Sequence, residues 1–166
     1  FRAFEMEKKG WVLIDPGSAA GLDGTISKAA ESGNPWFGYY WNPTSIVGKY
    51  DLQAVPWGID FAGRDNWDNC ITKAEQDCAD PKPTAWTKSE VNSIVTANFA
   101  TTGGKDALKY VKKRTFPGEV MNGMLVYMAD NQAKGSDAAI EFLKQHENIW
   151  GKWVSSGAKK KIKAGL

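Results

Sequence analysis

The chain has few of the residues from which most enzyme active sites and metal centres are made. It contains one histidine, His146, and two cysteines among 166 residues. This set cannot complete a four-ligand zinc site within the chain. The sequence also has no phosphate-cradling glycine loop, no nucleophile elbow, and no Cys and His close together along the chain. We therefore expect no catalytic residues, no metal and no cofactor, and we interpret His146 as a surface or interface residue.

Neither charge nor hydrophobicity is concentrated enough to indicate a nucleic acid or a bilayer as partner. The 21 basic and 19 acidic residues leave a net charge of +2, far from the strongly basic balance of nucleic-acid-binding domains. The lysine-rich run 159–163 is confined to the last residues and predicts a solvated helix face. No apolar stretch approaches the ~20 residues that span a bilayer. A hydrophobic content of 42% is that of an ordinary globular domain with one core.

The two cysteines lie close together in a polar, turn-rich loop. Cys70 and Cys78 in such a segment suit a disulfide better than buried thiols, which implies an oxidising compartment. A calcium ion is a competing use of the acidic residues around them, although these lack the spacing of an EF-hand loop. The acidic residues are Asp65, Asp68, Glu75, Asp77 and Asp80.

The apolar pattern predicts the α/β fold class. Residues 11–14 have the length of a short strand, and a helix begins at Ser18 as N-cap and ends near Gly33. The aromatic run 36–41 and residues 50–55 predict further strands. Strand, helix and strand in this order predict a mixed or parallel sheet flanked by helices.

The rest of the chain divides into a loop and a helix-rich C-terminal half. Residues 56–88 show little periodicity and contain both cysteines. From Thr87 the pattern is helical, with a capping-box sequence before Val91 and a later helix that begins at Pro117. We expect an α/β cleft segment at 1–55, a disulfide-stapled loop at 56–88 and a helical segment at 89–166.

Aromatic residues are the compositional excess of this chain. It has eight Trp, and because Trp is rarely fully buried, several rings should lie at a surface or cleft. The run 36–41 gathers two Trp, two Tyr and a Phe before the turn at Asn42 and Pro43. Ring faces attract cations, although the same rings could pack as ordinary strand residues. Strand alternation would place Tyr39 and Trp41 on one face and Tyr40 on the other.

A helix start and an aromatic cluster together suggest a zwitterion as ligand. A helix beginning at Ser18 offers backbone N–H groups and partial positive charge to an anion such as a carboxylate. A trimethylammonium group has no N–H donor, so hydrogen bonding cannot select it. Trp and Tyr faces arranged as a cage are its best recognition element.

The chain resembles the substrate-binding proteins of glycine betaine-type ABC importers. The resemblance covers essentially the whole sequence, and Trp41 with Pro43 matches the Trp-x-Pro segment of that family. The other matching parts are Gly48–Leu52, Cys70–Pro83, Met128–Gln132, Ala139–Leu143, Trp150 and Trp153.

The resemblance implies both a fold and a site. The fold would be a lobe of the periplasmic-binding-protein type II class, one of two that close on a quaternary amine held by Trp side chains. The resemblance implies that Trp41 is a cage residue, because it matches the Trp of the motif directly. Tyr39, Tyr40 and Trp36 are neighbours without such a match, and we rank Tyr39 second and the other two behind it. Ser18, at the helix start, is the candidate residue for binding the anion. The implied partners are a zwitterionic or cationic small molecule and an ABC permease in the membrane. The implied location is periplasmic or otherwise extracytoplasmic.

The length of the chain differs from that of the family, whose members are about twice as long. Phe1–Gly10 lacks an initiator Met and has the pattern of the last turns of a helix. We therefore expect residues 1–166 to be the C-terminal portion of a two-lobed protein. Alone, it would have an incomplete site with weak or no affinity, or would complete that site by self-association with a second copy.

A carbohydrate is the main alternative ligand, because Trp and Tyr faces also stack on sugars. An extracellular carbohydrate-binding module, or a glycosidase fragment that uses Asp15, Asp51 or Glu119, is the competing hypothesis. Within the preferred interpretation, the candidate ligands include glycine betaine, proline betaine, choline, carnitine, trimethylamine N-oxide and dimethylsulfoniopropionate.

Overall fold

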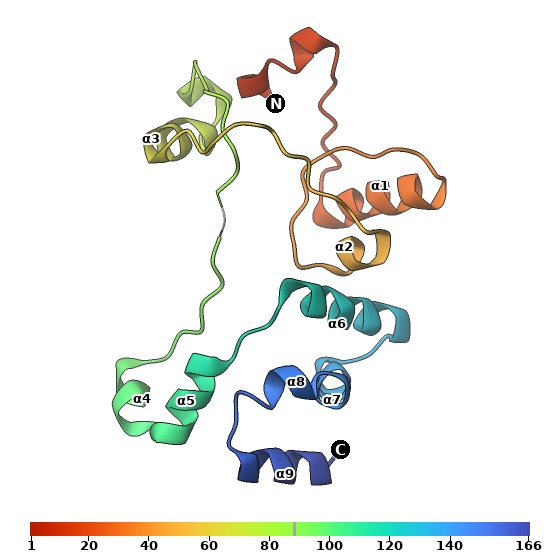
Figure 1. Cartoon of the computed structure of the whole chain (residues 1–166). Coiled ribbons are helices and arrows are strands. Elements are labelled where there is room, and N and C mark those ends of the chain that lie inside the picture. The colour runs from red at the N-terminus through yellow and green to blue at the C-terminus, as the bar shows by residue number, and fades with distance from the viewer. Residues whose placement is uncertain (88) are drawn as a thin grey trace. The chain divides into compact units, whose positions relative to one another are not determined.

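The regular structure of this protein consists of helices and helical turns. The computed structural model describes residues 1–87 and 89–166 (Figure 1), and no strand or sheet occurs among them. The predicted α/β fold class, with a type II lobe built on a sheet, is therefore wrong for the described chain. The helix-rich C-terminal half is as expected.

The described residues form two units that interleave along the sequence. The first, called here the disulfide unit, consists of Phe1–Leu22 and Gln53–Glu90. The second, called here the helical unit, consists of Asp23–Leu52 and Val91–Leu166. Helix α1 (Ala19–Glu31) begins in the first unit and continues in the second.

The helical unit holds most of the regular structure. Thr44, Thr96 and Ser155 cap three of its helices by accepting a hydrogen bond from the backbone N–H three residues later. Pro117 directly precedes α6, as its fixed φ favours. The helices after α1 are α2 (Ser45–Tyr50), α4 (Ala97–Thr102), α5 (Lys105–Lys113), α6 (Gly118–Asn131), α7 (Gly135–Gln145), α8 (Glu147–Trp150) and α9 (Ser156–Ala164).

The core of the helical unit is aromatic. Met124, Phe142, Trp150 and Trp153 form one buried cluster. Phe142 stacks on Trp153 with ring centroids 5.6 Å apart, and the indole N–H of Trp150 donates to the carbonyl of Leu143 at 2.7 Å. Two of the chain's many Trp residues are thus structural, as their large buried area favours.

Helix α2 packs closely against α6 (Figure 1). A Cβ added at Gly48 would lie only 2.8 Å from Cγ2 of Val126 and 3.1 Å from the backbone oxygen of Asn122, so only glycine permits this approach. The buried side chain of Asn122 accepts a hydrogen bond from the backbone N–H of Thr44 at 3.0 Å. This contact fixes α2, and with it the end of the aromatic run, on the long helix α6.

The lysine-rich run near the end of the chain forms α9, the solvated helix face predicted for it. Ile162 turns toward the core, while Lys159 and Lys163 each lie 2.8 Å from the carboxylate of Glu147 on α8. These two hydrogen bonds hold the pKa of the Glu147 carboxyl below its ordinary value. The run therefore has a structural role within the helical unit.

The segments predicted as strands are irregular. Residues 11–14 have neither helix nor strand, and Val12, Leu13 and Ile14 are 77%, 68% and 72% exposed. The aromatic run 36–41 is also irregular, and Tyr50 ends α2 rather than starting a strand. A strand is stable only beside a second strand, and the side-chain pattern does not show whether one is present. The helix predicted after Thr87 is also wrong over 91–95, where Val91 is 97% exposed.

The disulfide unit is held by the predicted Cys70–Cys78 bond. Its helical turns are Arg2–Phe4, Glu7–Lys9, α3 (Arg64–Asn66), Trp67–Ile71 and Glu75–Asp77.

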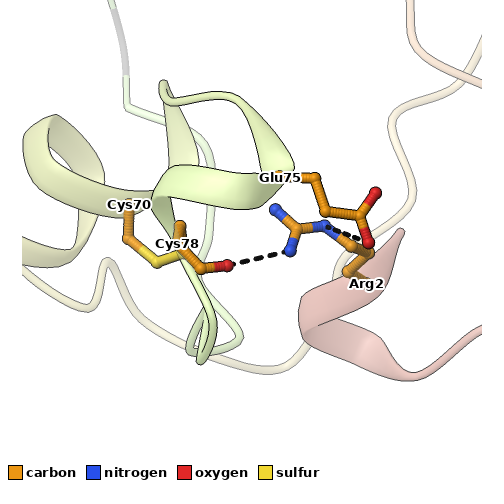
Figure 2. A network of polar contacts seen from close by, with 4 residues as sticks. All are labelled: Arg2, Cys70, Glu75 and Cys78. Carbon is orange, nitrogen blue, oxygen red and sulfur yellow. Dashed lines mark hydrogen bonds and ion pairs between the residues drawn. A yellow bond between two sulfur atoms is a disulfide. The ribbon is translucent and has the colours of Figure 1, made fainter.

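The guanidinium of Arg2 donates to the carbonyl of Cys78 at 2.9 Å and lies 4.0 Å from the Glu75 carboxylate (Figure 2). The side chain of Asn66 exchanges two 3.1 Å hydrogen bonds with the backbone of Lys82. Arg2 thus joins the first turn of the chain to the loop that the disulfide closes.

Removal of the disulfide is expected to loosen this unit. The bond closes a loop with a sequence separation of 8, for which loop-closure entropy predicts a loss of roughly 2–3 kcal/mol. In the Cys70→Ser/Cys78→Ser variant, backbone amides of residues 61–86 should exchange with deuterium faster, while those of α6 and α7 should not change. Reduced wild-type protein is the matched control and should behave like the variant. Equal exchange in oxidised and reduced protein would contradict this role.

Candidate functional site

The aromatic run crosses from α1 to α2 in the helical unit and presents ring faces to solvent. Trp41 is 42% exposed and Tyr39 is 56% exposed, whereas Tyr40 is half-buried. The ring of Trp41 lies 4.5 Å from that of Tyr40, at an interplanar angle of 25°, and 6.2 Å from that of Tyr39. These three predicted residues therefore lie together. The strand alternation expected for them is not followed, because both tyrosine rings lie beside Trp41.

Trp36 is anchored at the start of the run. Its indole N–H donates to the hydroxyl of Thr25 on α1 at 3.1 Å. The chain folds over this ring at Gly38, where an added Cβ would lie 2.8 Å from the Trp36 ring. Trp36 therefore ties the run to α1.

Tyr40 joins the aromatic run to α1 through a hydrogen bond to a carboxylate. Its hydroxyl donates to the carboxylate of Asp23 at 2.6 Å. Burial, with the hydrogen bond to Asp23 and its negative charge, raises the pKa of Tyr40 to about 12, and a hydrogen bond with Thr44 acts in the opposite direction. At neutral pH Tyr40 is therefore a neutral hydrogen-bond donor to the Asp23 side chain.

This raised pKa predicts a pH dependence of stability. Folded Tyr40 keeps its proton to higher pH than the unfolded chain, whose value is near 10.0. The stabilising contribution is therefore fully present below pH 10 and is lost as pH rises through 12. Tyr40→Phe should lower the free energy of unfolding at pH 8. The difference from wild type should then shrink by roughly 1 kcal/mol by pH 12, because solvent partly screens a half-buried group. Urea unfolding across this range measures it, and a constant difference would contradict it.

Ser18 caps α1, as predicted, within the disulfide unit. Its hydroxyl accepts a hydrogen bond from the backbone N–H of Gly21 at 3.0 Å. Just before it, the Asp15 carboxylate accepts from the backbone N–H of Gly17 at 2.8 Å. The capping role of Ser18 is thereby established, and its role as a ligand-binding residue stays a prediction.

The acidic residues of the carbohydrate hypothesis are dispersed. Asp15 is used at the turn before α1, and Asp51 is the C-cap of α2. Glu119 lines a cavity of about 330 Å³ between α6 and α7, together with His146 and Tyr127. Glycosidases place two carboxylates about 5–10 Å apart, and Glu119 is the one carboxylate among the described residues that line this cavity. The geometry does not favour a glycosidase.

Two further features bear on ligands and membranes. Among the described residues, no group of three or more His, Cys, Asp or Glu side chains is placed to hold a metal ion. In the same part of the chain, none of the helices has the length and apolar character needed to cross a bilayer.

Sequence reasoning missed Asp23 and Thr25, the α1 residues that hold the aromatic run. Both are polar residues in a helix, and Asp23 lies 17 residues before its partner Tyr40. No local signal marks such a contact, because it depends on how the run folds back along α1.

The geometry of the aromatic run does not by itself show the family of the protein, but comparison with family models does. A model of the substrate-binding domain of the ABC-type glycine betaine transport system matches residues 1–145. The chain belongs to this family. The resemblance to this family is thus confirmed over residues 1–145, whereas Trp150 and Trp153 lie beyond the matched residues. The description names a binding component of a transport system. The match includes the whole aromatic run and ends before α8. No curated protein matches the chain.

Proposed function

We propose that this glycine betaine family member captures a small quaternary-ammonium or similarly methylated osmolyte outside the cytoplasmic membrane and delivers it to an ABC permease. The exposed face of Trp41, with Tyr39 and Tyr40 beside it, is the observation that supports the proposal. Capture is reversible and involves no chemistry on the ligand.

Trp41 is the principal wall of the proposed site. A cation over its face gains about 0.5–2 kcal/mol, the larger value when the contact is desolvated. Tyr39 offers a second exposed face, and Tyr40 supports Trp41 from the buried side. Trp36 contributes by anchoring the run to Thr25.

The chain is, in this proposal, the C-terminal portion of a two-lobed protein, and the other lobe supplies the remaining walls. Lobe closure around the ligand would convert occupancy into a shape that a permease recognises. Experiments on ligand binding are therefore designed for the protein expressed from its complete gene.

A thermal-shift panel tests the function directly. Millimolar glycine betaine, choline or another methylated amine from the candidate set should raise the melting temperature. A ligand at 100 times its Kd stabilises the folded state by about 2.7 kcal/mol, which corresponds to several degrees for a domain of this size. Glucose and maltose should leave it unchanged. Stabilisation by saccharides and not by methylated amines would favour the carbohydrate-binding hypothesis instead.

A further inference from the structure

Asp23 connects the buried side of the aromatic run to helix α1. The carboxylate of Asp23 accepts the 2.6 Å hydrogen bond from the Tyr40 hydroxyl, and the ring of Tyr40 stacks at 4.5 Å on Trp41. Asp23 and Tyr40 are both partly buried, while Trp41 is 42% exposed. The exposed Trp41 ring thus stacks on the Tyr40 ring, whose hydroxyl is held by its hydrogen bond to Asp23.

We propose that Asp23 is a positioning residue for the ligand-binding face of Trp41. It acts through Tyr40 and makes no contact with the ligand. The inference rests on the proposed function, because the ligand it serves is the methylated cation assigned to Trp41.

The orientation of the Tyr40 ring depends on its hydrogen bond to Asp23. The run 36–41 is irregular, so no sheet fixes its side chains. A hydrogen bond from the Tyr40 hydroxyl to a carboxylate is stronger than one between two neutral groups, and it restricts the rotamers of this half-buried ring. When the rings already have the orientation that binding requires, less side-chain conformational entropy is lost as the cation binds. Without Asp23, Tyr40 and the stacked Trp41 would sample other orientations.

The same helix supplies a matched control. The carboxylate of Glu31, near the other end of α1, accepts a 2.8 Å hydrogen bond from the hydroxyl of Tyr50. This pair has the same chemistry, but Tyr50 lies in α2 outside the aromatic run. Glu31→Ala therefore removes an equivalent Tyr–carboxylate bond without touching the support of Trp41.

The first test uses no ligand and measures the quenching of Trp41 fluorescence by acrylamide. Asp23→Ala should raise the quenching constant relative to wild type, and this difference should disappear when Trp41 is replaced by Phe. Asp23→Asn, which keeps an oxygen acceptor without the charge, should give a quenching constant between those of wild type and Asp23→Ala, and Glu31→Ala should not alter the wild-type value. Equal quenching in Asp23→Ala and wild type would overturn the proposal, as would a difference that persists in the Trp41→Phe background.

The second test measures the affinity for glycine betaine and choline by titration calorimetry, on the protein from its complete gene. Asp23→Ala should bind about tenfold more weakly and Asp23→Asn within about threefold of wild type. Tyr40→Phe should match Asp23→Ala, and the double variant should be no weaker than either, because both substitutions remove one hydrogen bond. Unchanged affinity in Asp23→Ala, beside a large loss in Trp41→Ala, would overturn the role of Asp23 alone. Failure of wild type to bind any methylated amine would instead overturn the proposed function.

Discussion

Trp41→Ala is expected to abolish most of the affinity for glycine betaine in the protein from its complete gene. The substitution removes a ring that is 42% exposed, that stacks on the ring of Tyr40 at 4.5 Å and that lies 6.2 Å from the ring of Tyr39. Loss of one desolvated cation–π wall, together with its apolar contact, costs roughly 2 kcal/mol or more, which is about a 30-fold loss in affinity. Titration calorimetry measures this loss.

Two variants at the same position separate the ring face from simple bulk. Trp41→Phe keeps an aromatic face and should retain more affinity than Trp41→Leu, which keeps apolar volume without a π system. Far-UV circular dichroism should be unchanged in both variants, since Trp41 lies outside the buried cluster. Wild-type affinity in Trp41→Ala would remove Trp41 from the site.

Trp150→Ala is expected to give the largest loss of stability in the helical unit. Trp150 is 1% exposed, belongs to the cluster with Phe142 and Trp153, and donates its indole N–H to Leu143. Replacing a buried Trp by Ala costs about 3–5 kcal/mol, a large part of the 5–15 kcal/mol that stabilises an ordinary domain. Urea unfolding followed by circular dichroism should show a correspondingly lower midpoint.

Trp150→Phe is the control for this substitution. It keeps most of the ring volume and loses the hydrogen bond, so it should cost less than half as much as Trp150→Ala. Equal losses in the two variants would show that the hydrogen bond, and not the packing, dominates. A loss below about 1 kcal/mol in Trp150→Ala would contradict the assignment of this ring to the core.

Local signals predicted the local features well. Cys70 and Cys78, isolated in a polar loop, predicted the disulfide that the structure contains. Ser18 predicted the cap of α1, and Pro117 predicted the start of α6. Each of these features depends on a few neighbouring residues and on backbone groups within one turn, so the sequence holds the needed information.

Features that depend on distant partners were not predicted. The apolar run at 11–14 has a side-chain pattern suited to a sheet, but the described chain forms no sheet in which it could pair. The aromatic run is held instead by side-chain hydrogen bonds to Asp23 and Thr25 of α1. The helical periodicity after Thr87 likewise predicted a helix that residues 91–95 do not form. Helix propensity alone stabilises a short helix only weakly when no face of it is packed.

For the candidate site too, the local features were predicted and the long-range contacts were not. A cluster of rings and the Trp-x-Pro segment indicated where to look and which family to expect, and the family is confirmed. That Trp41 is exposed while Tyr40 is half-buried and bonded to Asp23 follows from three-dimensional contacts alone.

In the proposed site, the Trp41 face binds the positive charge of a methylated ligand. Titration calorimetry compares glycine betaine with 3,3-dimethylbutanoate, an isostere whose head is uncharged, because the two differ only in nitrogen against carbon at the trimethyl head. We expect glycine betaine to bind at least tenfold more tightly to wild type, and this preference to collapse in Trp41→Ala. Equal affinity for both compounds, or a preference that survives in Trp41→Ala, would show that the Trp41 face does not bind the charge.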